Sequence, residues 1–331
     1  MPELDLLRLA LTGLLAFGLS YGLDRSMAHK KLTPPGFRDP GRRLGALLAV
    51  GLLFWLGITS PLAALGQPAV EPDLTAVSTP QLFLLHFLMV STLLTWFALG
   101  FAGLRPAPRP APRPAPPPVD EPVGLEPAEP EPTSAESEAP PAVPVVPEAP
   151  VPVPLSRQLA AQFGFVAPSI PREIGLGLGL GLGAWVAVLA GIMVFALVLL
   201  GLGADELLPR QPPAMVPFIA GLPFMVRILI SLSAGVVEEW FFRGFLQPRI
   251  GIVLSTVLFA LAHFSYGQPF MLIGITLLSL IYGLLVKWRQ NIWPAIAAHA
   301  LFDGIQLLVL VPFTLKFLDA QGGKAAAFLG F

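Results

Sequence analysis

The sequence contains repeated apolar runs of about 20 residues, separated by short polar segments. A helix needs about 20 consecutive apolar residues to cross the hydrocarbon core of a bilayer. Only 12% of the residues are charged, against about 25% in ordinary globular domains. We therefore predict an all-α, polytopic membrane helix bundle of about eight spans, near residues 5–23, 44–65, 81–104, 174–203, 214–247, 251–267, 270–286 and 291–313.

The charges between the spans predict how the bundle lies in the membrane. Segment 24–43 contains six Lys or Arg and two Asp, and the positive-inside rule places such a loop in the cytoplasm. The amino terminus then lies outside, and Lys287 and Arg289 fall on the cytoplasmic side. Loop 66–80, which has no Lys or Arg, falls outside. We expect a multi-pass protein integral to the plasma (inner) membrane.

Residues 105–155 have a different composition from the rest of the chain. They hold half of its 38 prolines, followed by an acidic stretch. Such a segment has little to bury and favours an extended coil, so we predict a disordered, Pro/Glu-rich cytoplasmic linker. A ligand for a proline-binding module is the alternative. The linker divides a three-span membrane region, 1–104, from a five-span region, 156–331, and residues 155–165 are typical of an amphipathic helix on the membrane surface.

The run GLGLGLGLG, from Gly175 to Gly183, alternates like a strand but lies in a predicted span. An open strand cannot satisfy its backbone groups in lipid, so we predict a helix. On a helix Gly175, Gly179 and Gly183 stack at four-residue intervals, and Gly177 and Gly181 lie nearby. This pattern predicts a smooth surface for close helix packing.

Ionisable side chains inside spans are costly and are functional candidates by default. In VVEEWFFRGF, Arg243 follows Glu239 by four residues, so the two share one helical face and can pair. A purely structural salt bridge explains this pair equally well. Glu238 lies about 100° round the helix without an obvious local cation. Glu238 is therefore the stronger candidate for a chemical role.

Two further spans carry histidines. FALAH places Phe259 and His263 on one helical face, and HALFD does the same for His299 and Asp303. Hydrogen bonds between or within helices are the structural alternative for both. Counted at 1.5 Å per residue, the three motifs lie at similar depths, which predicts one cluster. His86 lies in an apolar span with no ionisable neighbour in sequence, and we expect it to be a packing or interfacial residue.

The order EExxxR, FxxxH and HxxxD, each on its own span, resembles the CPBP family of intramembrane proteases. That family includes type II CAAX prenyl endopeptidases and bacteriocin-processing or immunity proteins. The resemblance covers about 220–315 and extends over a CPBP-like protease domain of 156–331. It implies that Glu238 activates the attacking water with His263 beside it, and that Glu239 and Arg243 orient and support. His299 and Asp303 match positions that stabilise the oxyanion or bind a metal.

Two mechanisms follow from this resemblance. In a zinc version, His263, His299 and a carboxylate, Asp303, hold the ion while Glu238 accepts the proton of its water. In a metal-free version, Glu238 and His263 deprotonate water, and protonated His299 stabilises the oxyanion. Prenyl-protein enzymes typically carry Asn where this chain has Asp303, and an ionised Asp donates no hydrogen bond. We favour the glutamate-dependent version with zinc optional.

The function predicted from these motifs is that of an integral membrane endopeptidase cleaving near the cytoplasmic side. Its partners would be membrane lipid and a peptide or protein substrate, with or without a lipid modification. A non-catalytic scaffold or immunity protein that binds a membrane partner, and an ion or proton translocator, are the alternatives. The net charge of -1 argues against a nucleic-acid partner, and the absence of cysteine excludes disulfides, thiolate metal sites and a Cys nucleophile.

Overall fold

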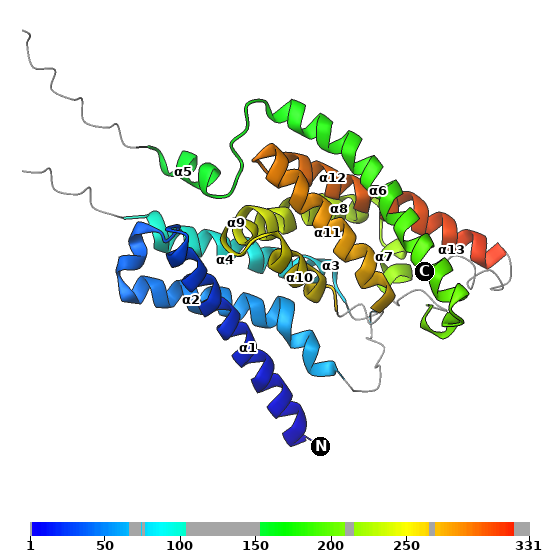
Figure 1. Cartoon of the computed structure of the whole chain (residues 1–331), viewed down its shortest axis with the longest axis horizontal. Helices are drawn as coiled ribbons and strands as arrows, with labels where there is room; N and C mark the ends of the chain where they lie inside the picture. The colour runs from blue at the N-terminus through cyan, green and yellow to red at the C-terminus, as the bar shows by residue number, and fades with distance from the viewer. Residues whose placement is uncertain are drawn as a thin grey trace, which may run out of the picture. The chain divides into compact units, whose positions relative to one another are not determined.

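A computed structural model describes residues 2–65, 74, 77–103, 153–208, 215–264 and 269–320. The described residues form helices joined by short turns and loops, with no strand among them (Figure 1). The predicted all-α class is therefore confirmed. The predicted disorder of the linker 105–155 falls almost entirely outside the described residues.

The amino-terminal part contains three long helical segments. The first is α1 (Pro2–His29). The second, α2 (Pro40–Phe54), begins where Asp39 accepts a hydrogen bond from the Arg42 backbone N–H at 2.9 Å, and Pro40 occupies the first turn. It continues through a π-helical segment, Trp55–Thr59, and a short 3-10 helix, Ser60–Ala64. A short helix, α3 (Thr79–Leu82), precedes the third, α4 (Leu84–Phe101).

The carboxyl-terminal part contains the other helices. Gly251, with a φ of 87°, lets the chain turn sharply between α9 and α10. The predicted helix at 155–165 is present as α5, while its place on a membrane surface stays a prediction. In chain order the helices are α5 (Leu155–Gln162), α6 (Ile170–Gly201), α7 (Met215–Gly221), α8 (Phe224–Glu239), the π-helical segment Trp240–Leu246, α9 (Gln247–Ile250), α10 (Ile252–Ala262), α11 (Pro269–Arg289), α12 (Trp293–Ile305), the π-helical segment Gln306–Leu310 and α13 (Val311–Ala320).

Among the described residues, six helical segments are long and apolar enough to cross a membrane. They correspond to six of the eight predicted spans. The predicted span 214–247 is divided among α7, α8 and a π-helical segment, and 251–267 contains α10, which has 11 residues. The helical membrane bundle is confirmed, but the count of eight is not. The six segments are Asp5–His29, Pro40–Ala64, Leu84–Phe101, Ile170–Gly201, Met271–Arg289 and Trp293–Phe317.

The glycine run forms part of α6, as predicted, but the packing face differs from the predicted one. A Cβ atom at Gly181 would lie 2.7 Å from the Ala298 Cα of α12, and one at Gly177 would meet the backbone of Pro294. A Cβ at Gly175, Gly179 or Gly183 would meet no atom within 4 Å. The intervening pair, Gly177 and Gly181, therefore provides the close approach of α6 to α12.

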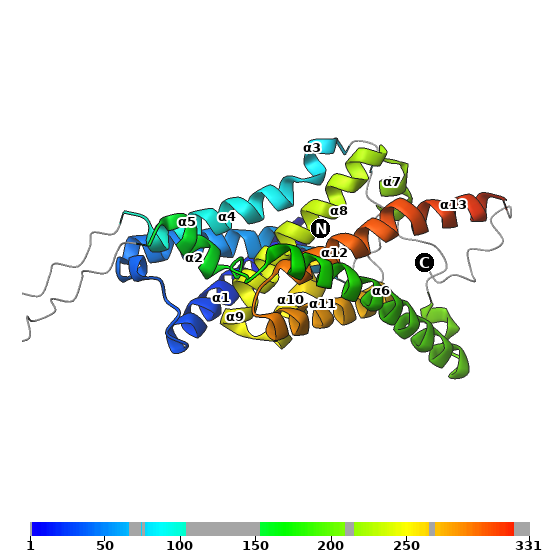
Figure 2. The same cartoon turned by 90° about the horizontal axis from the view of Figure 1, so that it is seen from above.

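The opposite side of α12 is packed equally closely. A Cβ at Gly235 of α8 would lie 2.8 Å from the Ala300 Cβ of α12. Helices α6, α8 and α12 consequently lie side by side, and both views of the bundle show this arrangement (Figures 1 and 2). Because α12 has a glycine contact on two sides, its rotation and depth are tightly determined.

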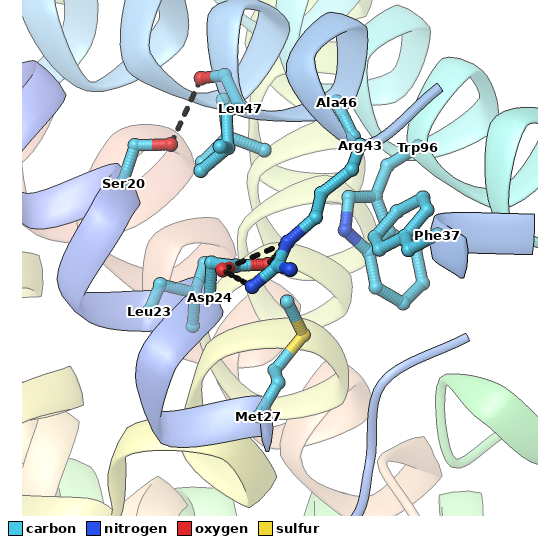
Figure 3. Close-up of a pocket in the computed structure, with 10 residues that line it drawn as sticks. Ser20, Leu23, Asp24, Met27, Phe37, Arg43, Ala46, Leu47 and Trp96 are labelled. Carbon is cyan, nitrogen blue, oxygen red and sulfur yellow. Dashed lines mark hydrogen bonds and ion pairs between the residues drawn. The ribbon is translucent and has the colours of Figure 1, made fainter. Parts of the chain in front are cut away.

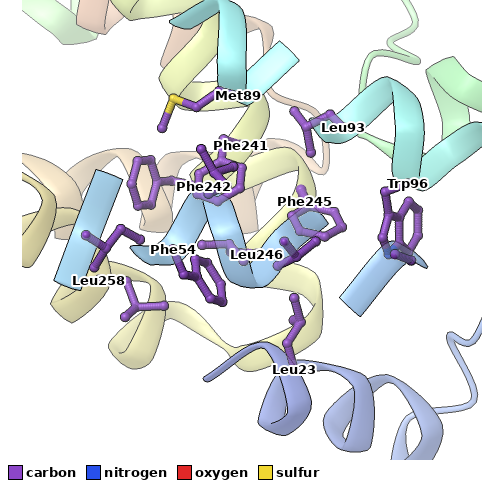
Figure 4. Packing of buried hydrophobic residues seen from close by; sticks show 14 of the residues in the cluster. Leu23, Phe54, Met89, Leu93, Trp96, Phe241, Phe242, Phe245, Leu246 and Leu258 are labelled. Carbon is purple, nitrogen blue, oxygen red and sulfur yellow. The ribbon is translucent and has the colours of Figure 1, made fainter. Parts of the chain in front are cut away.

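The amino-terminal and carboxyl-terminal helices share one aromatic core (Figure 4). The Trp96 ring of α4 packs edge-on to Phe245, with ring centroids 5.0 Å apart. Phe54 of α2 packs edge-on to Phe241 at 6.2 Å. The described residues on the two sides of the linker thus form one compact unit.

Polar contacts join α1 to both α2 and α9. The Arg43 guanidinium pairs with the buried carboxylate of Asp24, beside a pocket of about 10 Å³ (Figure 3). That volume is close to the minimum for one water molecule. The Ser26 hydroxyl donates to the Arg249 carbonyl at 2.5 Å. These contacts fix α1 against both parts of the bundle.

We expect Gly181→Val to destabilise the fold because its side chain would push α12 away from α6. Overpacking of this kind costs about 1–3 kcal/mol. The measurement is the thermal unfolding midpoint in detergent, together with the folded yield after size exclusion. Gly179→Val is the matched control, since it makes the same change on the same helix in open space. Equal midpoints for the two variants would contradict the packing face described above.

Candidate active site

The adjacent carboxylates at the end of α8 have different partners. Glu239 contacts Arg243 and His299, whereas Glu238 contacts His86 and His263. Consecutive residues on a helix are separated by about 100°, so the two side chains leave the helix in different directions. Each glutamate therefore belongs to its own polar cluster, and the two clusters are neighbours.

The cluster around Glu239 is fully buried. The Arg243 Nη1 atom lies 2.9 Å from Glu239 Oε1, and His299 Nδ1 lies 2.8 Å from the same oxygen. Glu239 is 0% exposed and Arg243 is 1% exposed. A buried carboxylate needs such partners because an unpaired charge in an apolar interior is very costly.

Arg243 is enclosed by aromatic rings and by the backbone of α11. Its Nη2 donates to the Ser279 carbonyl at 3.2 Å, and its guanidinium carbon lies 4.4 Å from the Phe259 ring centroid. The Tyr282 ring lies 5.6 Å away. Arg243 belongs to the π-helical segment Trp240–Leu246, and such widened turns often occur at functional sites. The predicted pairing of Glu239 with Arg243 is thus present and joins α8 to α10 and α11.

Glu238 lies between two imidazole rings. His86 Nε2 is 3.5 Å from Glu238 Oε1, and His263 Nε2 is 3.9 Å from Oε2. The three side chains are each 15–17% exposed, so they are more accessible than Glu239. The Oε2 atoms of Glu238 and Glu239 are both buried and without a hydrogen-bond partner in the part of the chain that the structure describes. The partial exposure of Glu238 therefore distinguishes it from Glu239 as the carboxylate that water or a substrate can approach.

The contact of His86 with Glu238 corrects the expectation from sequence that His86 only packs or lies at an interface. His86 comes from α4, 152 residues before Glu238. It is the one ionisable residue of α4, and it follows the 3–4 spacing of the buried Met89, Leu93 and Trp96. An ionisable side chain on a core-facing stripe is a signal that its partner lies on another helix.

His263 ends α10 and lies at its C-cap. Its Nδ1 is 2.8 Å from the Phe259 carbonyl, which accepts a hydrogen bond from an Nδ1–H. In a neutral ring the proton on Nδ1 leaves Nε2 as an acceptor. The Nε2 atom and Glu238 Oε2 then face each other as two acceptors 3.9 Å apart, a spacing that one bridging water can satisfy.

His299 and Asp303 lie beside the other two motifs. His299 Nε2 is 3.6 Å from Asp303 Oδ2, as the four-residue spacing predicted. The Phe259 ring separates the two histidines, with centroids 4.6 Å from His263 and 6.1 Å from His299. The six residues singled out in the sequence therefore lie together in one region of the bundle. They are Glu238, Glu239, Arg243, His263, His299 and Asp303.

A zinc ion would require three of these side chains to face a common point. No group of three His, Asp or Glu side chains among the described residues is arranged to hold a metal ion. Each ring nitrogen of His299 already faces a carboxylate. In the structure, the side chains of His263, His299 and Asp303 are not arranged around a common point where they could hold a zinc ion. Zinc binding by these three residues therefore stays a prediction.

We expect Glu239→Ala to lower stability by about 3–5 kcal/mol, because it leaves the Arg243 charge buried without its carboxylate. The measurement is the thermal unfolding midpoint of the purified protein. Glu206→Ala, which removes an exposed carboxylate, is the control. The double variant Glu239→Ala with Arg243→Met should recover part of the loss. An unchanged midpoint for Glu239→Ala would refute the structural role of this pair.

Part of this chain is similar in sequence to known proteins. Residues 220–305 match the family model described as type II CAAX prenyl endopeptidase, Rce1-like. The uncharacterized protein YpbD of Bacillus subtilis (strain 168) is 34% identical over 79 residues, which is 24% of this chain and 42% of that protein. No solved structure matches. The matched segment includes all six predicted site residues and excludes His86, and it confirms the predicted resemblance to CAAX-type membrane proteases over residues 220–305.

Proposed function

We propose that this chain is a glutamate-dependent membrane endopeptidase in which Glu238 activates water. The observation that carries the proposal is the division of labour between the adjacent carboxylates. Glu239 is fully buried against Arg243 and His299, whereas Glu238 is 15% exposed and its Oε2 faces His263. A general base must reach the proton that it abstracts, directly or through one water, and Glu238 satisfies this condition.

Peptide hydrolysis follows from a water held between Glu238 Oε2 and His263 Nε2. Glu238 takes one proton as the water oxygen forms a bond to the peptide carbonyl carbon, and the carbonyl oxygen becomes an oxyanion. The carbon–nitrogen bond then breaks, and the leaving nitrogen takes the proton from Glu238. One peptide bond and one water thus give one carboxyl group and one amine, and the carboxylate of Glu238 is regenerated.

His299 is the residue proposed to stabilise the oxyanion. Its Nδ1 is held by Glu239 at 2.8 Å, whereas its Nε2 has only the longer 3.6 Å contact with Asp303. With the ring held at Nδ1, an Nε2–H can therefore donate to a developing negative charge that lies beside it. Asp303 itself, when ionised, has no proton to donate and acts by holding His299.

The substrate class is a peptide or protein segment that reaches the site from the membrane, with or without a lipid modification. We place cleavage near the cytoplasmic side on the charge distribution. Basic segment 24–43 and the end of α11, with Lys287 and Arg289, are both predicted to face the cytoplasm.

We expect Glu238→Gln to reduce cleavage by at least about 1,000-fold, because an amide cannot accept the proton of water. The measurement is hydrolysis of a peptide panel, with and without a lipidated end, by purified protein in detergent micelles. The unfolding midpoint of the variant, compared with that of the wild type, controls for misfolding. Cleavage at the wild-type rate would overturn the assignment of Glu238. If deletion of the gene changes the phenotype of the cell and the Glu238→Gln variant restores the wild-type phenotype, the non-catalytic scaffold is favoured.

We expect activity to survive removal of divalent metals. The purified enzyme is treated with 1,10-phenanthroline, dialysed, and assayed on the same peptides with and without added zinc. Activity within about twofold of the untreated enzyme agrees with a glutamate-dependent mechanism that needs no ion. Loss of activity that zinc restores would instead establish the zinc version with His263, His299 and Asp303.

A further inference from the structure

Helix α4 reaches the candidate site from outside the segment that resembles CAAX-type proteases. Met89, Leu93 and Trp96 of this helix are buried in the aromatic core against Phe241 and Phe245 (Figure 4). Because these residues recur at three- and four-residue intervals, they define the face of α4 that points at the end of α8. His86 continues the same stripe one turn earlier.

The position of His86 is fixed by this packing. The Trp96 ring lies 5.0 Å from Phe245 and 6.1 Å from Phe163, so α4 is held against two separate segments of the carboxyl-terminal part. Interiors packed in this way allow little rotation of a helix about its axis. The contact of His86 with Glu238 is thus a consequence of rigid packing.

The two imidazoles contact different oxygens of the same carboxylate. His86 Nε2 lies 3.5 Å from Oε1, and His263 Nε2 lies 3.9 Å from Oε2. His86 Nδ1 is buried and has no hydrogen-bond partner among the described residues. A proton on Nε2 therefore avoids a buried, unpaired N–H at Nδ1 and makes His86 a donor to Glu238.

We infer that His86 is a positioning residue, which binds Oε1 of Glu238 and so holds Oε2 toward His263 and the attacking water. The inference rests on the proposed function, and it adds a contribution from the first three membrane helices to the site. Without His86 the carboxylate can rotate about its side-chain bonds, and Oε2 loses its fixed direction. The active centre is then composite, with residues from both sides of the linker.

Three variants separate this role from simple packing. His86→Leu fills the space but donates nothing, whereas His86→Gln places an N–H donor near the position of Nε2. Phe87→Leu, on the neighbouring and exposed position of α4, is the matched control. Loss of a hydrogen bond to a charged group corresponds to a decrease in rate of about 10- to 100-fold. We therefore expect kcat of His86→Leu to fall by that factor, with little change in KM.

We expect His86→Gln to recover activity to within about fivefold of the wild type and Phe87→Leu to match it. Equal losses in His86→Leu and His86→Gln at unchanged unfolding midpoints would overturn the donor role. A wild-type rate for His86→Leu would do so as well. A loss of activity in His86→Leu that is matched by Phe87→Leu would assign the effect to packing of α4.

A second measurement does not depend on cleavage. The chain has four histidines, so ¹⁵N-labelled histidine rings can be assigned with single His→Gln variants. We expect the ring signals of His86 to shift in Glu238→Gln and to stay unchanged in Glu206→Gln. If the wild type cleaves no peptide but this shift is present, the proposed function fails while the contact stands. If the wild type cleaves and the shift is absent, the positioning role of His86 fails alone.

Discussion

The buried ion pair between Glu239 and Arg243 is the interaction on which the arrangement of the site depends. It joins the end of α8 to the π-helical segment that follows, and through Ser279 and Phe259 it reaches α11 and α10. His299 adds α12 to the same carboxylate. A charge pair in an apolar interior is stable only when every partner is present. Five elements are thereby held together around this ion pair.

This pair also explains why two neighbouring glutamates can have different roles. Glu239 uses its charge to satisfy Arg243 and His299, and it is fully shielded from solvent. Glu238 is adjacent in sequence but faces two imidazoles and is 15% exposed. The first carboxylate joins helices, and the second is the one to which we assign the chemistry in the proposed mechanism.

Local spacing explains what could be predicted from the sequence. Residues four apart on a helix share a face, so the contacts of Glu239 with Arg243 and of His299 with Asp303 followed from the sequence. The direction of Glu238 followed from the 100° step between neighbours. Its contact with His86 did not, because the spacing in α4 shows that His86 faces the core but does not identify a partner 152 residues away.

The other differences between sequence and structure have similarly local causes. Glycine occupies every second position from 175 to 183, so more than one helical face is smooth, and only the partner helix decides which one packs. In the structure, Gly177 packs against Pro294 and Gly181 packs against Ala298. The predicted span 214–247 is interrupted before Pro223 and again by a π-helical segment, and hydropathy detects neither break.

The shared aromatic core has a consequence for how this protein can be divided. A fragment beginning at residue 154 would retain all six motif residues, yet it would expose Phe245 where Trp96 now packs and Phe241 where Phe54 now packs. It would also leave Glu238 open on the side now closed by α4. The minimal unit for expression is therefore longer than the region of family resemblance. It must include the helices that precede the linker.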